Sequence, residues 1–127
     1  MTRKTVNSPG APKAVGPYSH AVIASGDLVF CSGQIPIVPE TGELVTGPIR
    51  EQTRQVFKNI RSVLESAGAS LDRVVKVTVF LRNMEDFAEM NEEYAKWFPK
   101  DPPARSAVQV ARLPKDAGIE IEVVALK

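Results

Sequence analysis

The fold of this 127-residue chain is decided by residues 48–81, which read PIREQTRQVFKNIRSVLESAGASLDRVVKVTVFL. The first part predicts a helix from Pro48 to Ala67, because proline suits the first helical position and Gly68 suits the left-handed position that ends a helix. Apolar residues at helical spacing predict its buried face: Val56, Ile60, Val63, Leu64 and Ala67. Residues 74–81 alternate as a strand does, and we expect one side to carry Val75, Val77, Val79 and Leu81.

Two short strands are expected before this segment, at residues 20–24 and 28–32. Residues 25–27 between them contain a glycine and an aspartate, which suit the tight turn of a β-hairpin. Residues 9–17 and 35–47 are rich in proline and glycine, and they indicate an ordered loop and a surface excursion.

A second helix and two strands are expected after the segment. Asn83, followed three residues later by Asp86, resembles a helix entrance, and Pro99 would end the helix. Its buried face would carry the apolar and aromatic residues Phe87, Met90, Tyr94, Trp97 and Phe98. Further strands are predicted at residues 105–111 and 119–126.

This order of elements predicts an α+β fold in a single domain, residues 1–127, with both helices on one face of the sheet. The other face would be half polar, which suits a subunit interface or the lining of a site, and a merely solvated face is the alternative. That face is expected to carry Thr78, Phe80, Arg105, Ala107, Gln109, Glu120, Glu122 and Val124.

Charge balance and residue counts exclude several classes of protein. Sixteen basic residues against 15 acidic ones give a net charge of +1, which disfavours non-specific nucleic-acid binding. One histidine and one cysteine cannot form an internal disulfide or a closed zinc site. No cofactor or metal motif is present, so we expect neither. Without a membrane-length apolar run or a signal peptide, we expect a cytoplasmic protein, with the mitochondrion as the alternative.

Polar residues gather where the predicted strands meet loops. Each has an ordinary explanation: Tyr18 could cap the core, Ser32 and Gly33 could form a bulge, and Arg105 could pair with a surface acid. Together they offer a guanidinium, hydroxyl donors and backbone N–H groups that no side chain shields. This combination suits a small carboxylate ligand.

The imidazole of His20 and the thiol of Cys31 are the residues from which nucleophilic catalysis would have to be built. Both lie in predicted strands, where a packed histidine and a buried, inert thiol are the common states. We therefore do not expect either to act as a catalytic group.

Motifs along nearly the whole chain make the sequence resemble the Rid family of reactive-intermediate enamine/imine deaminases, also called the YjgF family, and its RidA branch in particular. The early and central motifs are Gly16-Pro-Tyr-Ser19, Cys31-Ser-Gly-Gln-Ile-Pro36, Asn59-Ile-Arg-Ser-Val-Leu64 and Val74-Val-Lys-Val-Thr-Val79. The most specific block comes last and consists of Pro103-Ala-Arg-Ser106, Val110-Ala-Arg-Leu-Pro-Lys115 and Ile119-Glu-Ile-Glu122.

The resemblance implies a fold, an assembly and an activity. The fold would be a chorismate-mutase-like mixed sheet, assembled as a homotrimer with a central barrel and active sites between subunits. The activity would be cofactor-free hydrolysis of 2-aminoacrylate, 2-iminopropanoate and 2-iminobutanoate to 2-oxo acids and ammonia. These imines are released by pyridoxal-phosphate enzymes such as serine and threonine dehydratases.

The resemblance also assigns roles to residues. Arg105 matches the arginine that clamps the substrate carboxylate, and Glu120 matches the acid that holds the attacking water. Tyr18 and Ser32 match polar lining residues, while Gly33 and Asn91 lie in the corresponding motif segments. Spacing alone cannot choose between Glu120 and Glu122, because both would lie on one strand face.

The sequence departs from the family pattern at Ala107, where many relatives carry cysteine. Imine hydrolysis needs water, an electrophilic carbon and proton transfers, so the loss of this thiol leaves the expected activity in place, and the backbone N–H of residue 107 can still donate. The main alternative is a trimeric module that binds a 2-oxo acid without turnover. An endoribonuclease is less favoured, given the low net charge and the single imidazole.

Overall fold

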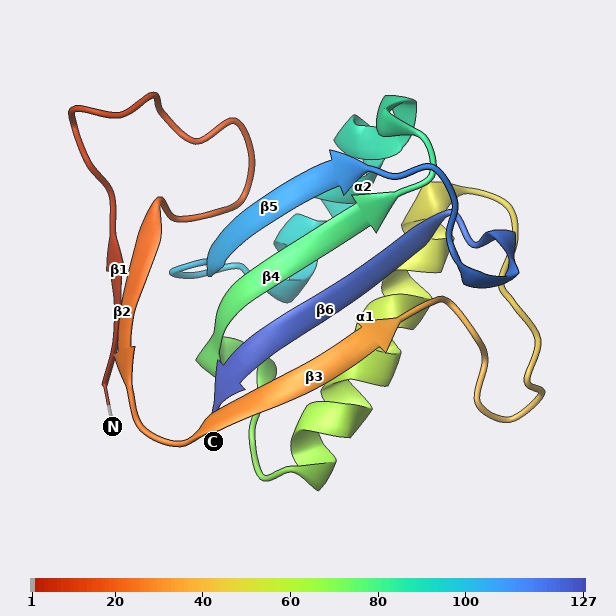
Figure 1. The fold of residues 1–127 in the computed structure, drawn as a ribbon, viewed down its shortest axis with the longest axis horizontal. Coiled ribbons are helices and arrows are strands. Elements are labelled where there is room, and N and C mark those ends of the chain that lie inside the picture. The colour runs from red at the N-terminus through yellow and green to blue at the C-terminus, as the bar shows by residue number, and fades with distance from the viewer. Residues whose placement is uncertain (1) are drawn as a thin grey trace.

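The computed structural model describes residues 2–127, and its centre is a four-stranded sheet with the strand order β3-β6-β4-β5 (Figure 1). The strands are β3 (Leu28–Gln34), β4 (Val74–Leu81), β5 (Ala104–Gln109) and β6 (Ile119–Leu126). Strand β6 is antiparallel to both β3 and β4, whereas β5 is parallel to β4. The sheet is therefore mixed, as predicted.

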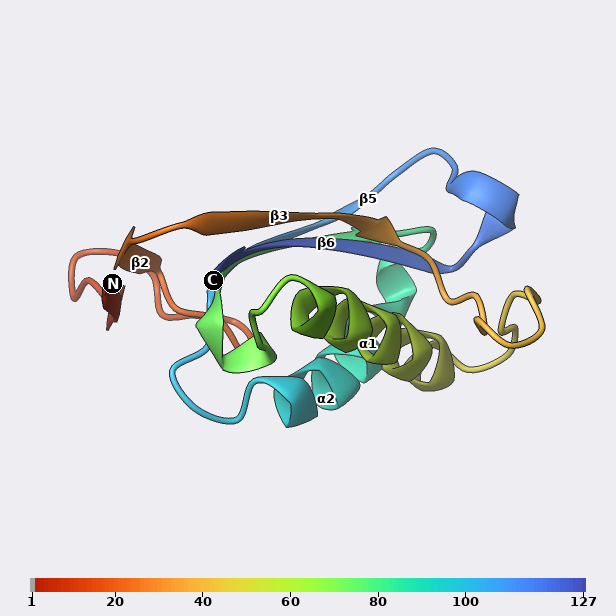
Figure 2. The same cartoon turned by 90° about the horizontal axis from the view of Figure 1, so that it is seen from below.

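Two helices, α1 (Ile49–Ser66) and α2 (Phe87–Trp97), cover the same face of this sheet (Figure 2). Apolar residues from both helices and from the strands form the core between the layers. The arrangement confirms the predicted α+β fold with both helices on one side. Within residues 2–127 no helix covers the sheet's other face, which we call the open face (Figure 2).

The predicted first helix is confirmed to within one residue at each end. Gly68 has φ +78°, and the N–H of Ala69 donates to the carbonyl of Leu64 at 2.8 Å, which closes the helix as expected. One expectation is wrong: Val63 is 38% exposed, because it lies at the edge of the apolar stripe. Within residues 2–127 no helix combines the length and apolar character needed to cross a membrane.

The predicted hairpin at residues 25–27 is wrong. Strand β2 (Ala21–Ser25) pairs with an N-terminal strand, β1 (Thr2–Val6), which the sequence did not reveal. Strand β3 pairs instead with β6. The turn between β2 and β3 therefore carries the chain from a small two-stranded sheet into the main sheet, and Gly26, with φ 132°, lies in it.

A register shift at the start of β4 changes which valine is buried. Val74 pairs with Ala125, and Lys76 pairs with Val124, so Val75 is an extra residue in this strand. Val74 is fully buried beside Val77, whereas Val75 is only half-buried. The prediction that Val75 shares one side of the strand with Val77, Val79 and Leu81 is wrong, and the bulge is the reason.

The predicted composition of the open face is wrong for strand β5. Arg105, Ala107 and Gln109 pair with Val77, Val79 and Leu81, which are fully buried on the helix side. Paired residues of neighbouring strands share a face, so these β5 side chains face the helices. Their neighbours Ser106 and Val108 lie on the open face, beside Thr78 and Phe80.

Candidate active site

The guanidinium of Arg105 lies against helix α2. Its Nη1 donates to Oδ1 of Asn91 at 2.6 Å, and the bond is partly buried. Asn91 is flanked on α2 by Phe87 and Tyr94, at spacings that place all three side chains on one helix face. Arg105 faces the helices because it pairs with Val77 of β4, whose side chain is buried on that side of the sheet.

Three aromatic rings surround this guanidinium. Its Cζ lies 4.7 Å from the ring centre of Tyr94, 5.4 Å from that of Tyr18 and 5.5 Å from that of Phe87. Such distances are those of cation–π contacts. We call Arg105, Asn91, Tyr18, Phe87 and Tyr94 the Arg105 cluster.

Burial lowers the pKa of Arg105, and the nearby phenols of Tyr94 and Tyr18 oppose that shift. The guanidinium nonetheless stays charged, as arginine does in proteins. Within residues 2–127 its only hydrogen bond is the one to Asn91. Several N–H donors of a partly desolvated cation are therefore available to an anion.

The loop before β2 covers the Arg105 cluster. Gly16 approaches so closely that a Cβ there would lie 2.8 Å from Nη2 of Arg105 and 3.3 Å from Nδ2 of Asn91. The hydroxyl of Tyr18 accepts a hydrogen bond from the N–H of Val15 at 3.3 Å. The N–H and the hydroxyl of Ser19 both donate to the loop before β5, at 3.2 and 2.6 Å.

His20 fixes the same loop through both ring nitrogens. Nδ1 accepts from the backbone N–H of Ser8 at 2.9 Å, so the ring proton is on Nε2, which donates to the carbonyl of Pro12 at 2.7 Å. The ring is engaged with the main chain on both sides. This arrangement agrees with our expectation that His20 is packed.

Tyr94 carries a fully buried hydroxyl that makes no hydrogen bond within residues 2–127. Burial raises the pKa of Tyr94, and the charge of Arg105 opposes part of that shift. The phenol therefore stays protonated at neutral pH. Its ring packs at 5.5 Å from Phe57 and 5.0 Å from Phe98, so the same side chain belongs to the core and to the Arg105 cluster.

A second group, which we call the Glu120 cluster, contains Ser32, Gly33 and Glu120. Cys31 pairs with Val123 and Gln34 with Ile121, so Ser32 and Gly33 lie in a bulge outside the paired register. The carboxylate of Glu120 occupies the space beside Gly33, where a Cβ would lie 2.9 Å from Cδ. Within residues 2–127 this carboxylate has no hydrogen bond or ion pair.

The two clusters lie apart in one chain. Glu120 pairs with Phe80, and Arg105 pairs with Val77, three positions earlier on β4. This offset is about 10 Å along the strand, and the two side chains leave opposite faces of the sheet. The structure therefore brings together Arg105, Asn91 and Tyr18, and separately Ser32, Gly33 and Glu120, but not the two sets.

The other two residues considered from the sequence, Ala107 and Cys31, pack against or within the core. Ala107 is half-buried on the helix side of β5, where it packs against the core. Cys31 is 5% exposed, and burial raises the pKa of its thiol, which agrees with an inert cysteine. Within residues 2–127 no three acidic, histidine or cysteine side chains are grouped as metal ligands.

Sequence reasoning missed the aromatic part of the Arg105 cluster. Phe87 and Tyr94 were assigned to the buried face of the second helix, and that assignment is correct as far as packing goes. Asn91 on the same helix face is the sequence feature that could have revealed their contact with Arg105. A polar residue between two aromatic residues on a buried helix face indicates a polar partner in the layer packed against that face.

Comparisons with known proteins find close relatives over the whole chain. The sequence model of a family described as endoribonuclease L-PSP matches residues 8–127. A RutC family protein of Pyrococcus horikoshii is 55% identical over 98% of both chains. Reactive Intermediate Deaminase A of the Arabidopsis thaliana chloroplast is 47% identical over 98% of this chain and 66% of its own length. The YjgF gene product of E. coli is 42% identical, covers 98% of both chains, and superposes with a TM-score of 0.76.

Proposed function

Since the chain belongs to the endoribonuclease L-PSP family, which is the YjgF/RidA family, we propose that it hydrolyses small 2-imino acids to 2-oxo acids and ammonia without a cofactor. The substrates would be 2-iminopropanoate, 2-iminobutanoate and their enamine forms such as 2-aminoacrylate. The observation that carries the proposal is the guanidinium of Arg105, held by Asn91 and three rings with its other donors unpaired.

Arg105 would bind the substrate carboxylate through two parallel N–H donors. Bidentate pairing fixes the plane of the carboxylate and so the orientation of the neighbouring C2 atom. The hydrogen bond to Asn91 holds the guanidinium while it does so. The backbone N–H groups of Gly33 and Ala107 and the hydroxyls of Tyr18 and Ser32 are the proposed further contacts to the ligand.

Glu120 would act as the general base on water. Water adds to C2 while Glu120 takes one of its protons, and protonation of the nitrogen gives a carbinolamine. The proton of the C2 hydroxyl then passes to the amino group, so that the carbon–nitrogen bond breaks, ammonia leaves and the carbonyl forms. The imine is already electrophilic, so general acid–base catalysis that raises the rate on the order of a hundredfold suffices. A carboxylate without a protein partner, as at Glu120, suits this role.

A complete site would require a second copy of the chain, because Arg105 and Glu120 leave opposite faces of one sheet. We propose that the chain forms a homotrimer in which the Arg105 cluster of one subunit meets the Glu120 cluster of its neighbour. The open face, which lacks a covering helix, would line the central barrel (Figure 2).

A coupled assay tests the proposed reaction. Serine or threonine dehydratase generates the imine in place, semicarbazide traps what is not hydrolysed, and 2-oxo acid release is measured. The wild-type protein should accelerate release, and Arg105→Ala should lower the rate about a hundredfold or more. Arg112→Ala is the matched control, because that side chain is 81% exposed. An undiminished rate in Arg105→Ala would show that Arg105 does not bind the substrate.

The second candidate is a trimeric module that binds a 2-oxo acid without turnover, and Ala107, at the usual cysteine position, is the observation that favours it. Calorimetric binding of 2-oxobutanoate together with no acceleration in the coupled assay would establish this alternative. An endoribonuclease, as the family description reads, is less favoured, because both ring nitrogens of His20 are engaged with the main chain.

A further inference from the structure

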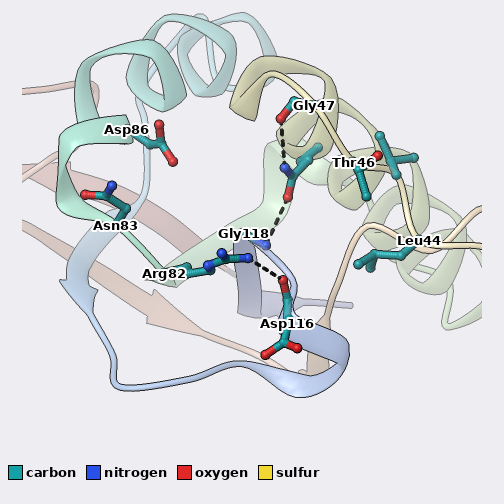
Figure 3. Close-up of a pocket in the computed structure, with 10 residues that line it drawn as sticks. Leu44, Thr46, Gly47, Arg82, Asn83, Asp86, Asp116 and Gly118 are labelled. Atoms are coloured by element: carbon teal, nitrogen blue, oxygen red, sulfur yellow. Dashed lines mark hydrogen bonds between the residues drawn. The ribbon is translucent and has the colours of Figure 1, made fainter.

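A cavity of about 320 Å³ lies next to the entrance of α1 (Figure 3), at the end of the sheet opposite to β1 and β2 (Figure 1). Four segments form it: the end of the 35–47 excursion, the first turn of α1, the turn after β4, and the turn before β6. None of its lining residues belongs to the Arg105 cluster or the Glu120 cluster. Its polar and charged lining residues are Thr46, Gln52, Arg82, Asn83, Asp86 and Asp116.

The walls of this cavity are held by side chains that bond to the main chain. The amide of Gln52 spans two segments: Nε2 donates to the carbonyl of Gly47, and Oε1 accepts from the N–H of Gly118, each at 3.0 Å (Figure 3). Nη1 of Arg82 donates to the carbonyl of Asp116 at 3.0 Å. The cavity is therefore preformed, as ligand sites usually are.

Opposite charges line the cavity without pairing across it. Beyond its bond to the carbonyl of Asp116, the guanidinium of Arg82 has no protein partner within residues 2–127, and the carboxylate of Asp86 has none at all there. Figure 3 shows both groups around the same space. The carboxylate of Asp116 is instead bonded to Arg112, at 3.2 Å.

We propose that this cavity binds the zwitterion of a small α-amino acid. The carboxylate of the ligand would accept from the free N–H groups of Arg82, and its ammonium would donate to Asp86. Asn83 and Thr46 offer a further amide and hydroxyl. A dicarboxylate or a phosphate would be repelled by the negative charge of Asp86, and a diamine would be repelled by the positive charge of Arg82. The two charges therefore select against all three kinds of ligand.

The size of the cavity agrees with a small ligand. Its volume lies at the lower end of the range for small-molecule sites, which is about 300–1,000 Å³. The proposal does not depend on the proposed enzymatic function, because the two sites share no residue. It assigns the protein an amino-acid site separate from the one that would hold the imine.

An NMR titration of the full-length, ¹⁵N-labelled protein tests the proposal with three matched probes. L-Alanine carries both charges, propionate only the carboxylate, and ethylamine only the ammonium. We expect saturable shifts for L-alanine at residues 44–47, 82–86 and 116–118, and about tenfold weaker binding in Arg82→Gln and in Asp86→Asn. Lys58→Gln, at an exposed position of α1 that does not line the cavity, is the control and should bind normally.

Three results would overturn the proposal. One is the absence of saturable shifts with L-alanine, and another is equal binding of propionate, which would make the cavity an anion site only. The third is L-alanine binding that survives Arg82→Gln but is lost in Arg105→Gln, which would place the amino acid at the Arg105 cluster. The dispersion of each variant's spectrum verifies that it is folded.

Discussion

At the scale of single residues, Gly33 leaves the space that the Glu120 carboxylate occupies. Its φ is not in the left-handed region, so alanine fits the backbone there, and the atoms nearest to the new Cβ all belong to the side chain of Glu120. We expect Gly33→Ala to displace this carboxylate and to lower the rate of imine hydrolysis about a hundredfold, with little change in the urea midpoint of unfolding. A variant with wild-type kinetics would show that the position of Glu120 does not matter.

Phe87 offers a separate test, because it contacts the guanidinium of Arg105 through its ring face at 5.5 Å. Leucine keeps much of the volume but removes the cation–π contact. We expect Phe87→Leu to raise KM for the imine about 2–10-fold with little change in kcat, since ground-state binding is what weakens. Phe87→Tyr retains the aromatic ring face and should have the KM of the wild type. An equal loss in both variants would indicate packing alone.

Single residues also show where sequence reasoning ends. Family resemblance pointed to Arg105 and Asn91, and the structure joins them by a hydrogen bond of 2.6 Å. From the sequence, Phe87 and Tyr94 could be assigned only to the core. An aromatic residue that packs in the core and one that packs against a buried cation recur at the same helical spacing, so the pattern does not separate them. The expected face of Arg105 was wrong because strand alternation cannot fix the register with a neighbouring strand.

At the scale of elements, the two helices are joined through Glu93, which is 3% exposed. Its carboxylate accepts from Arg54 on α1 at 3.1 Å and from Nε1 of Trp97 at 3.0 Å. Burial alone would raise the pKa of Glu93, but the hydrogen bonds from Arg54 and Trp97, with the charges of Arg54 and Lys96, lower it. The ionised form is therefore the one that stabilises the fold.

This carboxylate makes stability depend on pH. Because its folded-state pKa lies below the ordinary value of 4.5, its contribution is present at neutral pH and is lost as the pH falls through the folded-state value. We expect the free energy of unfolding of Glu93→Gln to be about 2 kcal/mol lower than that of the wild type at pH 7. This difference between the two proteins should shrink towards pH 3. Glu92→Gln, with a side chain 70% exposed, is the control. A difference that is constant with pH would contradict the prediction.

Elements with local signals could be predicted, and those that depend on distant partners could not. The helix at residues 49–66 has its start, stripe and stop signals in its own sequence. The hairpin failed because the partner of β2 is β1, at residues 2–6, whose charged alternation gives no strong strand signal. The bulge at Val75 likewise depends on pairing with β6.

At the scale of the whole molecule, the open face carries apolar side chains without a covering layer. Phe30 is 73% exposed and Val108 is 43% exposed. In the proposed trimer this face would be buried, so we expect light scattering to give about three times the 13.8 kDa of one chain. Phe30→Asp should shift the mass towards that of the monomer.

The same variant separates assembly from folding. Phe30→Asp should keep the far-ultraviolet circular dichroism spectrum of the wild type, because the core lies on the other face of the sheet. It should lose imine hydrolysis, since each proposed site draws on two subunits. A monomeric wild-type protein with full activity would contradict both the trimer and the shared site.

The placement of Arg105 and Glu120 on opposite faces of one sheet has a genetic consequence. Under the proposed assembly, each chain contributes to two different sites, so two inactive alleles can compensate for each other. Co-expressed Arg105→Ala and Glu120→Gln chains would form mixed trimers in which some sites receive an intact arginine from one parent and an intact glutamate from the other. A population that carries both defects would therefore regain part of the activity that each defect alone abolishes.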